Sequence, residues 1–259
     1  MSTYRIGRDT ILRAVVDGLS GSDDVTAVWE GGAAAFGRVD EWSDLDIMIA
    51  VRPGTKDAAI TIVDRALESL GPITVRYRLP EPAWHGHSQV FYMLEDASPY
   101  EFVDTCFMDD DTERKFLEPE THGTARVHFD RAGFVDQQPA DPGATRDRIA
   151  KRIAALRQTT QLGRTGTLKE LARGNDIEAL AYYSGSILRP LVELLRIRHC
   201  PGRQQFHTRY IQYDLPVEIV TRLRPLFFVR DADAVRAAHA EASRWMDRLL
   251  DELGDEFGV

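Results

Sequence analysis

Residues 30–51 read EGGAAAFGRVDEWSDLDIMIAV and decide the fold. The glycine pair Gly31-Gly32 lets a backbone turn approach a ligand closely and turn amide groups toward an anion. The end of the stretch alternates as a strand does, so Asp44 and Asp46 share one face while apolar residues take the other. Two like charges on one half-buried face repel each other, and the pair therefore predicts a cation between the carboxylates.

A Gly-Gly turn followed by Asp-x-Asp on a hydrophobic strand resembles the signature of the DNA polymerase beta-like nucleotidyltransferase superfamily. The residues that carry this resemblance are Gly31, Gly32, Gly37, Ser43, Asp44 and Asp46. The resemblance implies that the glycine turn and the helix after it bind a nucleoside triphosphate, with Gly31, Gly32, Ala33 and Ser43 as the binding residues. The family has Ser after its glycines, whereas this chain has Ala33, so only backbone amides remain there to contact a phosphate.

A third acidic residue interrupts the β-like run at residues 100–108, where Asp104 stands among apolar neighbours. A buried carboxylate is costly without a partner. In the superfamily a further acidic residue lies on a later strand beside the Asp-x-Asp pair, and Asp104 matches that position. The resemblance thus implies Asp44, Asp46 and Asp104 as catalytic residues and as ligands of two Mg²⁺ ions, that is, two-metal catalysis. A hydrogen-bonded structural aspartate is the alternative, and Glu95 stays a general-base candidate.

Hydrophobic periodicity predicts the elements around this motif. Helices are expected over residues 10–19 and 56–70, with a first helical turn at 33–36. Strands are expected over residues 25–29, 44–51, 73–79, 89–94 and 101–108, with a short one at 125–129. A mixed sheet of about five strands with flanking helices follows, and residues 1–136 are expected to form the catalytic domain.

The second half of the chain reads as helices after a Gln/Pro-rich linker at residues 137–143. Helices are expected over residues 144–162, 167–173, 176–199, 216–228 and 232–253. Glycines at 163–166 should break the first of these, and Pro190 should kink or divide the third near Leu188. The fold class is therefore α+β, with a C-terminal helical bundle over residues 144–259.

The polar, basic segment at residues 200–210 follows the longest of these helices. Together with the helices around it, this segment resembles the C-terminal domain of aminoglycoside adenylyltransferase-like proteins. In those enzymes the helical domain completes the sites for nucleotide and acceptor. The resemblance implies that Arg203, Arg209 and Tyr210 contact phosphate or base, and a solvated helix connector is the alternative for each.

Charge and composition narrow the classes of function. The net charge of −9 is unevenly distributed. Residues 1–140 hold 13 Lys or Arg and 25 Asp or Glu, whereas residues 141–259 hold 19 Lys or Arg and 16 Asp or Glu. An acidic first half disfavours a grip on long nucleic acid and favours a divalent metal with a small, cationic acceptor. With only Cys106 and Cys200, neither a disulfide framework nor a cysteine zinc site is indicated. No apolar run reaches the ~18 residues of a membrane span, and the N-terminus lacks a signal-peptide layout, so a cytoplasmic location is expected.

The resemblance implies transfer of a nucleoside monophosphate, most simply AMP from ATP, to a hydroxyl of a small molecule such as an aminoglycoside. The expected cofactors are Mg²⁺ and the nucleoside triphosphate, with neither a nucleic acid nor a membrane as partner. Transfer to a protein side chain, as in antitoxins of this superfamily, is the second interpretation and leaves a protein partner open. Transfer to a nucleic acid end is the third and is disfavoured by charge. From a different class, Ala33 keeps open a catalytically weakened nucleotide-binding or regulatory module.

Overall fold

The computed structural model describes residues 5–259 as two compact units. The first ends at Pro139 and the second begins at Ala140. The predicted α+β class, with a mixed sheet first and helices after it, is confirmed. Residues 1–4, on which the signal-peptide interpretation partly rests, lie outside the described residues. None of the helices in the described part is both long and apolar enough to span a membrane.

A six-stranded sheet in the order β3-β4-β5-β2-β1-β6 forms the centre of the first unit. Its strands are β1 (Val25–Glu30), β2 (Leu45–Val51), β3 (Ile73–Arg78), β4 (Ser88–Leu94), β5 (Val103–Asp109) and β6 (Arg126–Asp130). The neighbours β2 and β5 run parallel, while the other pairs run antiparallel. The short strand expected near residue 125 is therefore real, and it extends the edge beside β1.

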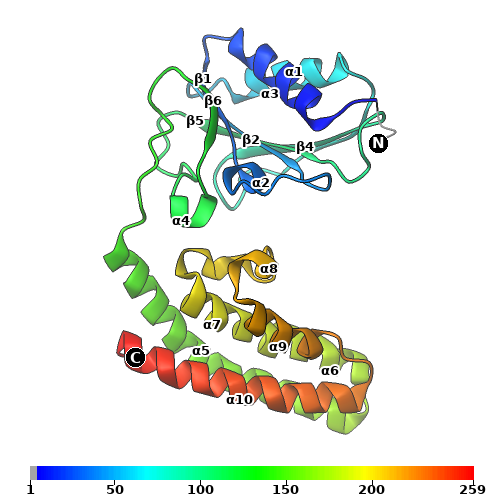
Figure 1. Cartoon of the computed structure of the whole chain (residues 1–259), viewed down its shortest axis with the longest axis vertical. Coiled ribbons are helices and arrows are strands. Elements are labelled where there is room, and N and C mark those ends of the chain that lie inside the picture. Colours follow the sequence, from blue (N-terminus) through cyan, green and yellow to red (C-terminus); the bar gives the residue numbers. More distant parts are fainter. Residues whose placement is uncertain (1–4) are drawn as a thin grey trace. The chain divides into compact units, whose positions relative to one another are not determined.

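One face of this sheet is covered by two amphipathic helices, α1 (Arg8–Ser20) and α3 (Lys56–Glu68), which lie together in Figure 1. The apolar residues of β2 that follow each aspartate, Leu45 and Ile47, are fully buried in the core beneath these helices. Once the apolar side chains enter this core, the acidic side chains of β2 must take the opposite face.

That opposite face is apolar at one end and acidic at the other. Trp29, Ala50 and Met108 join a smaller core towards the carboxyl ends of β2 and β5. The aspartates lie at the amino ends of the same two strands. Two single-turn helices, α2 (Gly32–Ala35) and α4 (Pro119–His122), belong to the connections of this unit.

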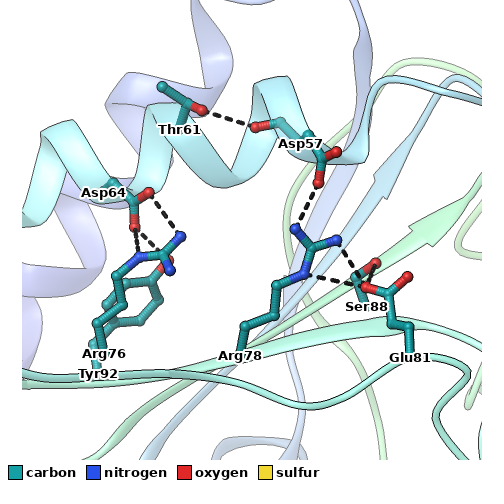
Figure 2. A network of polar contacts seen from close by, with 8 residues as sticks. All are labelled: Asp57, Thr61, Asp64, Arg76, Arg78, Glu81, Ser88 and Tyr92. Carbon is teal, nitrogen blue, oxygen red and sulfur yellow. Dashed lines mark hydrogen bonds and ion pairs between the residues drawn. The ribbon is translucent and has the colours of Figure 1, made fainter.

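The edge strand β3 is fastened to helix α3 by charged side chains (Figure 2). The Arg76 guanidinium donates two hydrogen bonds to the Asp64 carboxylate, at 2.8 and 3.0 Å, and the Tyr92 hydroxyl donates a third at 2.9 Å. Burial, together with the nearby Asp64 carboxylate, raises the pKa of Tyr92, so this hydroxyl keeps its proton. Charged residues on an edge strand also discourage pairing with another chain.

The second unit is helical throughout its regular structure. Its elements are α5 (Pro142–Arg173), α6 (Asp176–Tyr183), the π-helical turn η1 (Ser184–Leu188), α7 (Arg189–His199), the 3₁₀ turn η2 (Pro201–Phe206), α8 (Ile211–Asp214), α9 (Val217–Phe227) and α10 (Ala232–Phe257). The long helices α5 and α10 lie side by side (Figure 1). The Asp141 carboxylate caps α5 by accepting hydrogen bonds from the amides of Gly143 and Ala144.

The predicted break at residues 163–166 is wrong, since α5 runs through it without interruption. These glycines serve close helix packing instead. A Cβ atom on Gly163 would lie 2.5 Å from the Ser186 Cβ, and one on Gly166 would lie 3.1 Å from the Tyr182 ring. Glycine therefore lets α5 approach α6 and η1 more closely than any other residue would.

The predicted division of the 176–199 helix near Leu188 is confirmed. A π-helical turn over Ser184–Leu188 separates α6 from α7, and Pro190 stands in the first turn of α7. Proline has no amide hydrogen to donate and crowds the preceding turn, so a widened turn just before it accommodates the ring.

Candidate active site

The register between β2 and β5 brings two carboxylates together. Asp46 and Asp104 are direct partners in this parallel pair. Partners on neighbouring strands point to the same face, with the strands about 4.8 Å apart. The predicted convergence of acidic residues from two separate strands is thus present for Asp46 and Asp104.

Asp44 lies just before β2, on the same face as Asp46 by strand alternation. Its Oδ1 accepts a long hydrogen bond of 3.4 Å from the Phe102 amide, next to the start of β5. Glu101 is close by. Burial raises the pKa of Glu101, the positive charge of Arg8 opposes the rise, and the charge of Asp44 adds to it. Negative charge is therefore concentrated where β2 and β5 begin.

The glycine turn lies directly against Asp46. The Gly31 amide donates a 3.0 Å hydrogen bond to the Asp46 carbonyl, which ties the turn to β2. Gly32 has a positive φ of 51°, and a Cβ atom at this residue would collide with the Asp46 carboxyl group. Glycine is therefore required at 32 both by its backbone conformation and by the space that the carboxylate occupies.

The helix expected after the glycines is much shorter than the resemblance implies. Helix α2 is a single turn, Gly32–Ala35, so it supplies no extended helix dipole. Ala33 lies in that turn, and its carbonyl accepts hydrogen bonds from the amides of Phe36 and Arg38. This turn can offer a ligand backbone amides, as expected from a chain without the family's serine.

Ser43 is held within the loop that leads into β2. Its hydroxyl donates to the Asp40 Oδ1 at 2.7 Å and accepts from the Asp40 amide at 2.9 Å. The Trp42 amide donates to the same carboxylate at 3.0 Å. These hydrogen bonds, that of Ser43 first, lower the pKa of Asp40. In this arrangement Ser43 shapes the loop that precedes Asp44.

The strand that enters the glycine turn is anchored by a buried glutamate that sequence reasoning did not single out. Glu30 ends β1 with none of its surface exposed, and it accepts hydrogen bonds from Arg8 at 2.6 Å and His128 at 3.1 Å. Burial alone would raise the pKa of Glu30. The bonds from His128 and Arg8, together with the charges of Arg8 and Arg126, outweigh burial and lower it. A charged anchor therefore fixes the residue before Gly31.

The basic candidates lie in the second unit. The buried Arg196 organises their segment by donating to the carbonyls of Arg203, His207 and Arg209 and to the Asp214 carboxylate at 2.8 Å. Arg203 donates to the other Asp214 oxygen at 2.5 Å.

The remaining candidates of this segment stack on each other. The Arg209 guanidinium lies 5.4 Å from the Tyr210 ring centre, and Arg209 is an exposed residue. A role for Arg203, Arg209 and Tyr210 in nucleotide binding stays a prediction.

The carboxylates fit Mg²⁺ in one particular mode. Over residues 5–259, no group of three or more His, Cys, Asp or Glu side chains could hold a metal ion by itself. Mg²⁺ prefers oxygen ligands and is usually bound by one or two carboxylates together with substrate phosphates. The Asp46–Asp104 pair beside an amide-rich turn suits that shared mode, with Asp44 as a third candidate.

If the Gly31-Gly32 turn binds a nucleotide as the sequence predicts, Gly32→Ala should abolish that binding, because the added methyl group displaces the Asp46 carboxylate. It should also lower the free energy of unfolding by about 1–3 kcal/mol through the positive φ. Gly37→Ala is the matched control, since Gly37 has a φ of 63° but nothing within 4 Å of an added Cβ atom. Calorimetric nucleotide titration of both variants checks this. Equal nucleotide affinity in the two would contradict the role given to the contact between Gly32 and Asp46.

One residue of this site gave no signal in the sequence. Gln89, at the start of β4, donates hydrogen bonds from its side-chain nitrogen to both oxygens of Asp104, at 2.7 and 2.9 Å. A glutamine in a predicted strand carries no pattern of its own. Only the antiparallel register, in which Gln89 pairs with Cys106, reveals its place beside Asp104.

No protein-family model matches this sequence, and no curated protein matches it. Among solved structures, the chain is similar to an aminoglycoside 6-adenyltransferase from Bacillus subtilis, with 12% identity, a TM-score of 0.38, and coverage of 95% of this chain and 89% of that one. It is also similar to a spectinomycin adenyltransferase from Enterococcus faecialis, determined with ATP and spectinomycin, with 12% identity, a TM-score of 0.36, and coverage of 93% and 97%. Likenesses this distant say nothing about what this chain binds.

Proposed function

We propose that this protein is a metal-dependent nucleotidyltransferase that transfers a nucleoside monophosphate, most simply AMP from ATP, to a hydroxyl of a small molecule. The observation that carries the proposal is the pairing of Asp46 with Asp104 in the parallel register of β2 and β5, with the Gly31-Gly32 turn against Asp46. Residues 1–136 would form the catalytic domain. Residues 144–259 would form the helical domain.

Each part of the site has a task in this reaction. The acceptor hydroxyl gives its proton to solvent as its oxygen forms a bond to the α-phosphorus of the nucleotide. The bond from that phosphorus to the oxygen bridging to the β-phosphorus breaks, and pyrophosphate leaves. Asp46 and Asp104, with Asp44 as a third candidate, would share Mg²⁺ with the nucleotide phosphates. When bound, Mg²⁺ would neutralise phosphate charge and make the acceptor hydroxyl more acidic. The Gly31 amide holds the turn against Asp46, and the backbone amides that follow it in the turn, from Gly32 onward, would orient the phosphates. Catalysis would then come mostly from positioning and charge stabilisation.

The charge of the first half supports a small, cationic acceptor, such as an aminoglycoside-like antibiotic. With 13 basic against 25 acidic residues in 1–140, that half repels a polyanion such as nucleic acid and attracts amines. Transfer to a side chain of a protein partner, as in antitoxins of this type, is the second candidate.

Pyrophosphate release tests the proposal. Purified protein with Mg²⁺ and ATP should release pyrophosphate when a hydroxyl-bearing aminocyclitol is present, and much less without an acceptor. Mass spectrometry should find the acceptor heavier by one nucleotidyl group. A modified co-purifying protein would favour the antitoxin-type alternative. Nucleotide binding without release for any acceptor would favour a regulatory module.

Ala33→Ser is expected to tighten nucleotide binding about 10- to 100-fold, because a hydrogen bond to a charged group contributes about 1.5–3 kcal/mol. Ala34→Ser, in the same turn, is the matched control and should leave the affinity unchanged. Calorimetric titration with a non-hydrolysable ATP analogue measures both. Unchanged affinity in Ala33→Ser would show that the phosphates lie elsewhere.

A further inference from the structure

We propose that His85 and Gln89 form a positioning chain that fixes the carboxylate of Asp104. The inference rests on the proposed function, because the proposed function gives Asp104 its role in metal binding. The chain itself stands on three contacts, between His87 and His85, His85 and Gln89, and Gln89 and Asp104, which link a loop, strand β4 and strand β5. Neither His85 nor Gln89 would touch the substrate.

The contact between Gln89 and Asp104 fixes the orientation of the Gln89 amide. A carboxylate only accepts hydrogen bonds, so the nitrogen of the amide must face it, and the distances to the two carboxylate oxygens are 2.7 and 2.9 Å. The Gln89 Oε1 therefore points the other way. It lies 3.1 Å from the His85 Nε2 and must accept a hydrogen bond from it.

The His85 ring satisfies that demand in one tautomer. The His87 backbone amide, which can only donate, lies 3.1 Å from the His85 Nδ1, so Nδ1 carries no hydrogen. The proton of neutral His85 is then on Nε2, facing Gln89. The two ends of the chain thus require the same arrangement independently. Both ring nitrogens are engaged in it, which removes His85 as a metal ligand.

The surroundings hold this chain rigidly. His85 is only 4% exposed, and its ring packs against the rings of His87 and Phe116, with centroid distances of 5.6 and 6.2 Å. Side chains that position a ligand must themselves be fixed by packing, as here.

The loop that carries His85 is also fastened at its base (Figure 2). Arg78, at the end of β3, donates to the Glu81 carboxylate at 2.7 Å, and the Ser88 hydroxyl donates to the same Glu81 oxygen at 2.8 Å. The loop between β3 and β4 is therefore tied where it leaves and where it re-enters the sheet. Its tip, through His85 and Gln89, is tied to Asp104.

This chain gives Asp104 what a strand alone does not. Strand register places the Cα atom, but the carboxyl group can still rotate. Two hydrogen bonds from one amide fix the plane of that group relative to β4. Outer partners of this kind orient metal-binding carboxylates, and their loss commonly weakens metal affinity or activity about 10–100-fold.

The first arm of the test needs neither metal nor substrate. Nitrogen-15 NMR of histidine-labelled protein should show His85 with its proton on Nε2. In Gln89→Leu the tautomer should be kept by the His87 amide, but the Nε2 resonance should shift because its hydrogen bond to Gln89 is lost. The same signal should be unchanged in Gln138→Leu, the matched control, since Gln138 donates a 2.8 Å hydrogen bond to Asp136 on the exposed surface. A His85 proton on Nδ1 in the wild-type protein would overturn the chain.

The second arm measures nucleotide-dependent Mn²⁺ affinity and, separately, kcat and KM. Gln89→Leu should lower Mn²⁺ affinity and kcat about 10–100-fold with the acceptor KM unchanged. His85→Leu should act in the same direction. In His85→Gln the new side-chain amide can reach the position of Nε2, so this variant should recover most of the Mn²⁺ affinity and kcat that His85→Leu loses. Wild-type Mn²⁺ affinity in Gln89→Leu, or no difference between the two His85 variants, would overturn the positioning role.

The two arms separate this inference from the proposed function. If the wild-type protein binds neither Mn²⁺ nor nucleotide, the proposed function fails, and the NMR arm alone still decides whether His85 and Gln89 form the chain. If the wild-type protein binds Mn²⁺ with nucleotide and Gln89→Leu does so equally well, only the positioning inference fails.

Discussion

Asp46→Asn is expected to lower turnover by about a thousandfold or more, because metal-based charge stabilisation contributes several kcal/mol and each 1.4 kcal/mol is a factor of ten. The fold should be kept. Asp46 faces Asp104 across β2 and β5, and removal of one of two repelling carboxylates relieves the repulsion in the absence of metal. Initial rates of pyrophosphate release and the thermal unfolding midpoint are the two measurements.

Asp111→Asn is the control for this prediction. Asp111 is an exposed residue in the acidic run that follows β5, so its substitution removes the same charge from the same unit. The Asp111→Asn variant should keep the turnover of the wild-type protein. Wild-type turnover in Asp46→Asn would refute the role of Asp46, and an equal loss in Asp111→Asn would point to net charge instead of the site.

Arg196→Met is expected to destabilise the helical unit by about 3–5 kcal/mol, the usual cost of breaking a buried ion pair by removing one partner. Arg196 and Asp214 both have fully buried side chains, 2.8 Å apart. The substitution removes the Arg196 guanidinium from the Asp214 carboxylate, with which Arg203 also pairs. It also removes the donor to three backbone carbonyls of the 200–210 segment.

Arg198→Met tests the same helix at its surface. Arg198 lies two residues away on α7 and pairs with Glu252 and Glu256 at a partly exposed position. Surface ion pairs contribute about 0–1 kcal/mol, so this variant should unfold almost as the wild type does. Denaturant unfolding followed by circular dichroism compares the two. A loss below about 1 kcal/mol in Arg196→Met would contradict the central place given to Arg196 in this unit.

The fold could be predicted from the sequence wherever hydrophobic periodicity determines which face of a strand or helix is buried. Alternation in β2 places Asp44 and Asp46 opposite the apolar core, and the helical stripes of α1 and α3 identify what covers that core. The glycines of α5 show where this fails. A glycine that breaks a helix and a glycine that admits a neighbouring helix look the same in sequence, and only the closeness of Gly163 to Ser186 distinguishes them.

The site was predictable to the same extent. Asp104 could be found because an acidic residue inside an apolar strand needs a reason. Gln89 could not, because its role depends on the register of β4 against β5 and on a loop histidine at its other end. Similarly, the basic residues of the 200–210 segment read as ligand contacts in sequence. The partners of Arg203 show that part of that charge is used inside the helical unit.

The most direct test of the central claim is the effect of Mg²⁺ on nucleotide affinity. Calorimetric titration with a non-hydrolysable ATP analogue, with and without Mg²⁺, should show that Mg²⁺ markedly tightens binding to the wild-type protein. Asp46→Asn should lose that dependence. Nucleotide affinity that is the same with and without Mg²⁺, or a Mg²⁺ dependence that survives in Asp46→Asn, would contradict a shared metal site at Asp46 and Asp104.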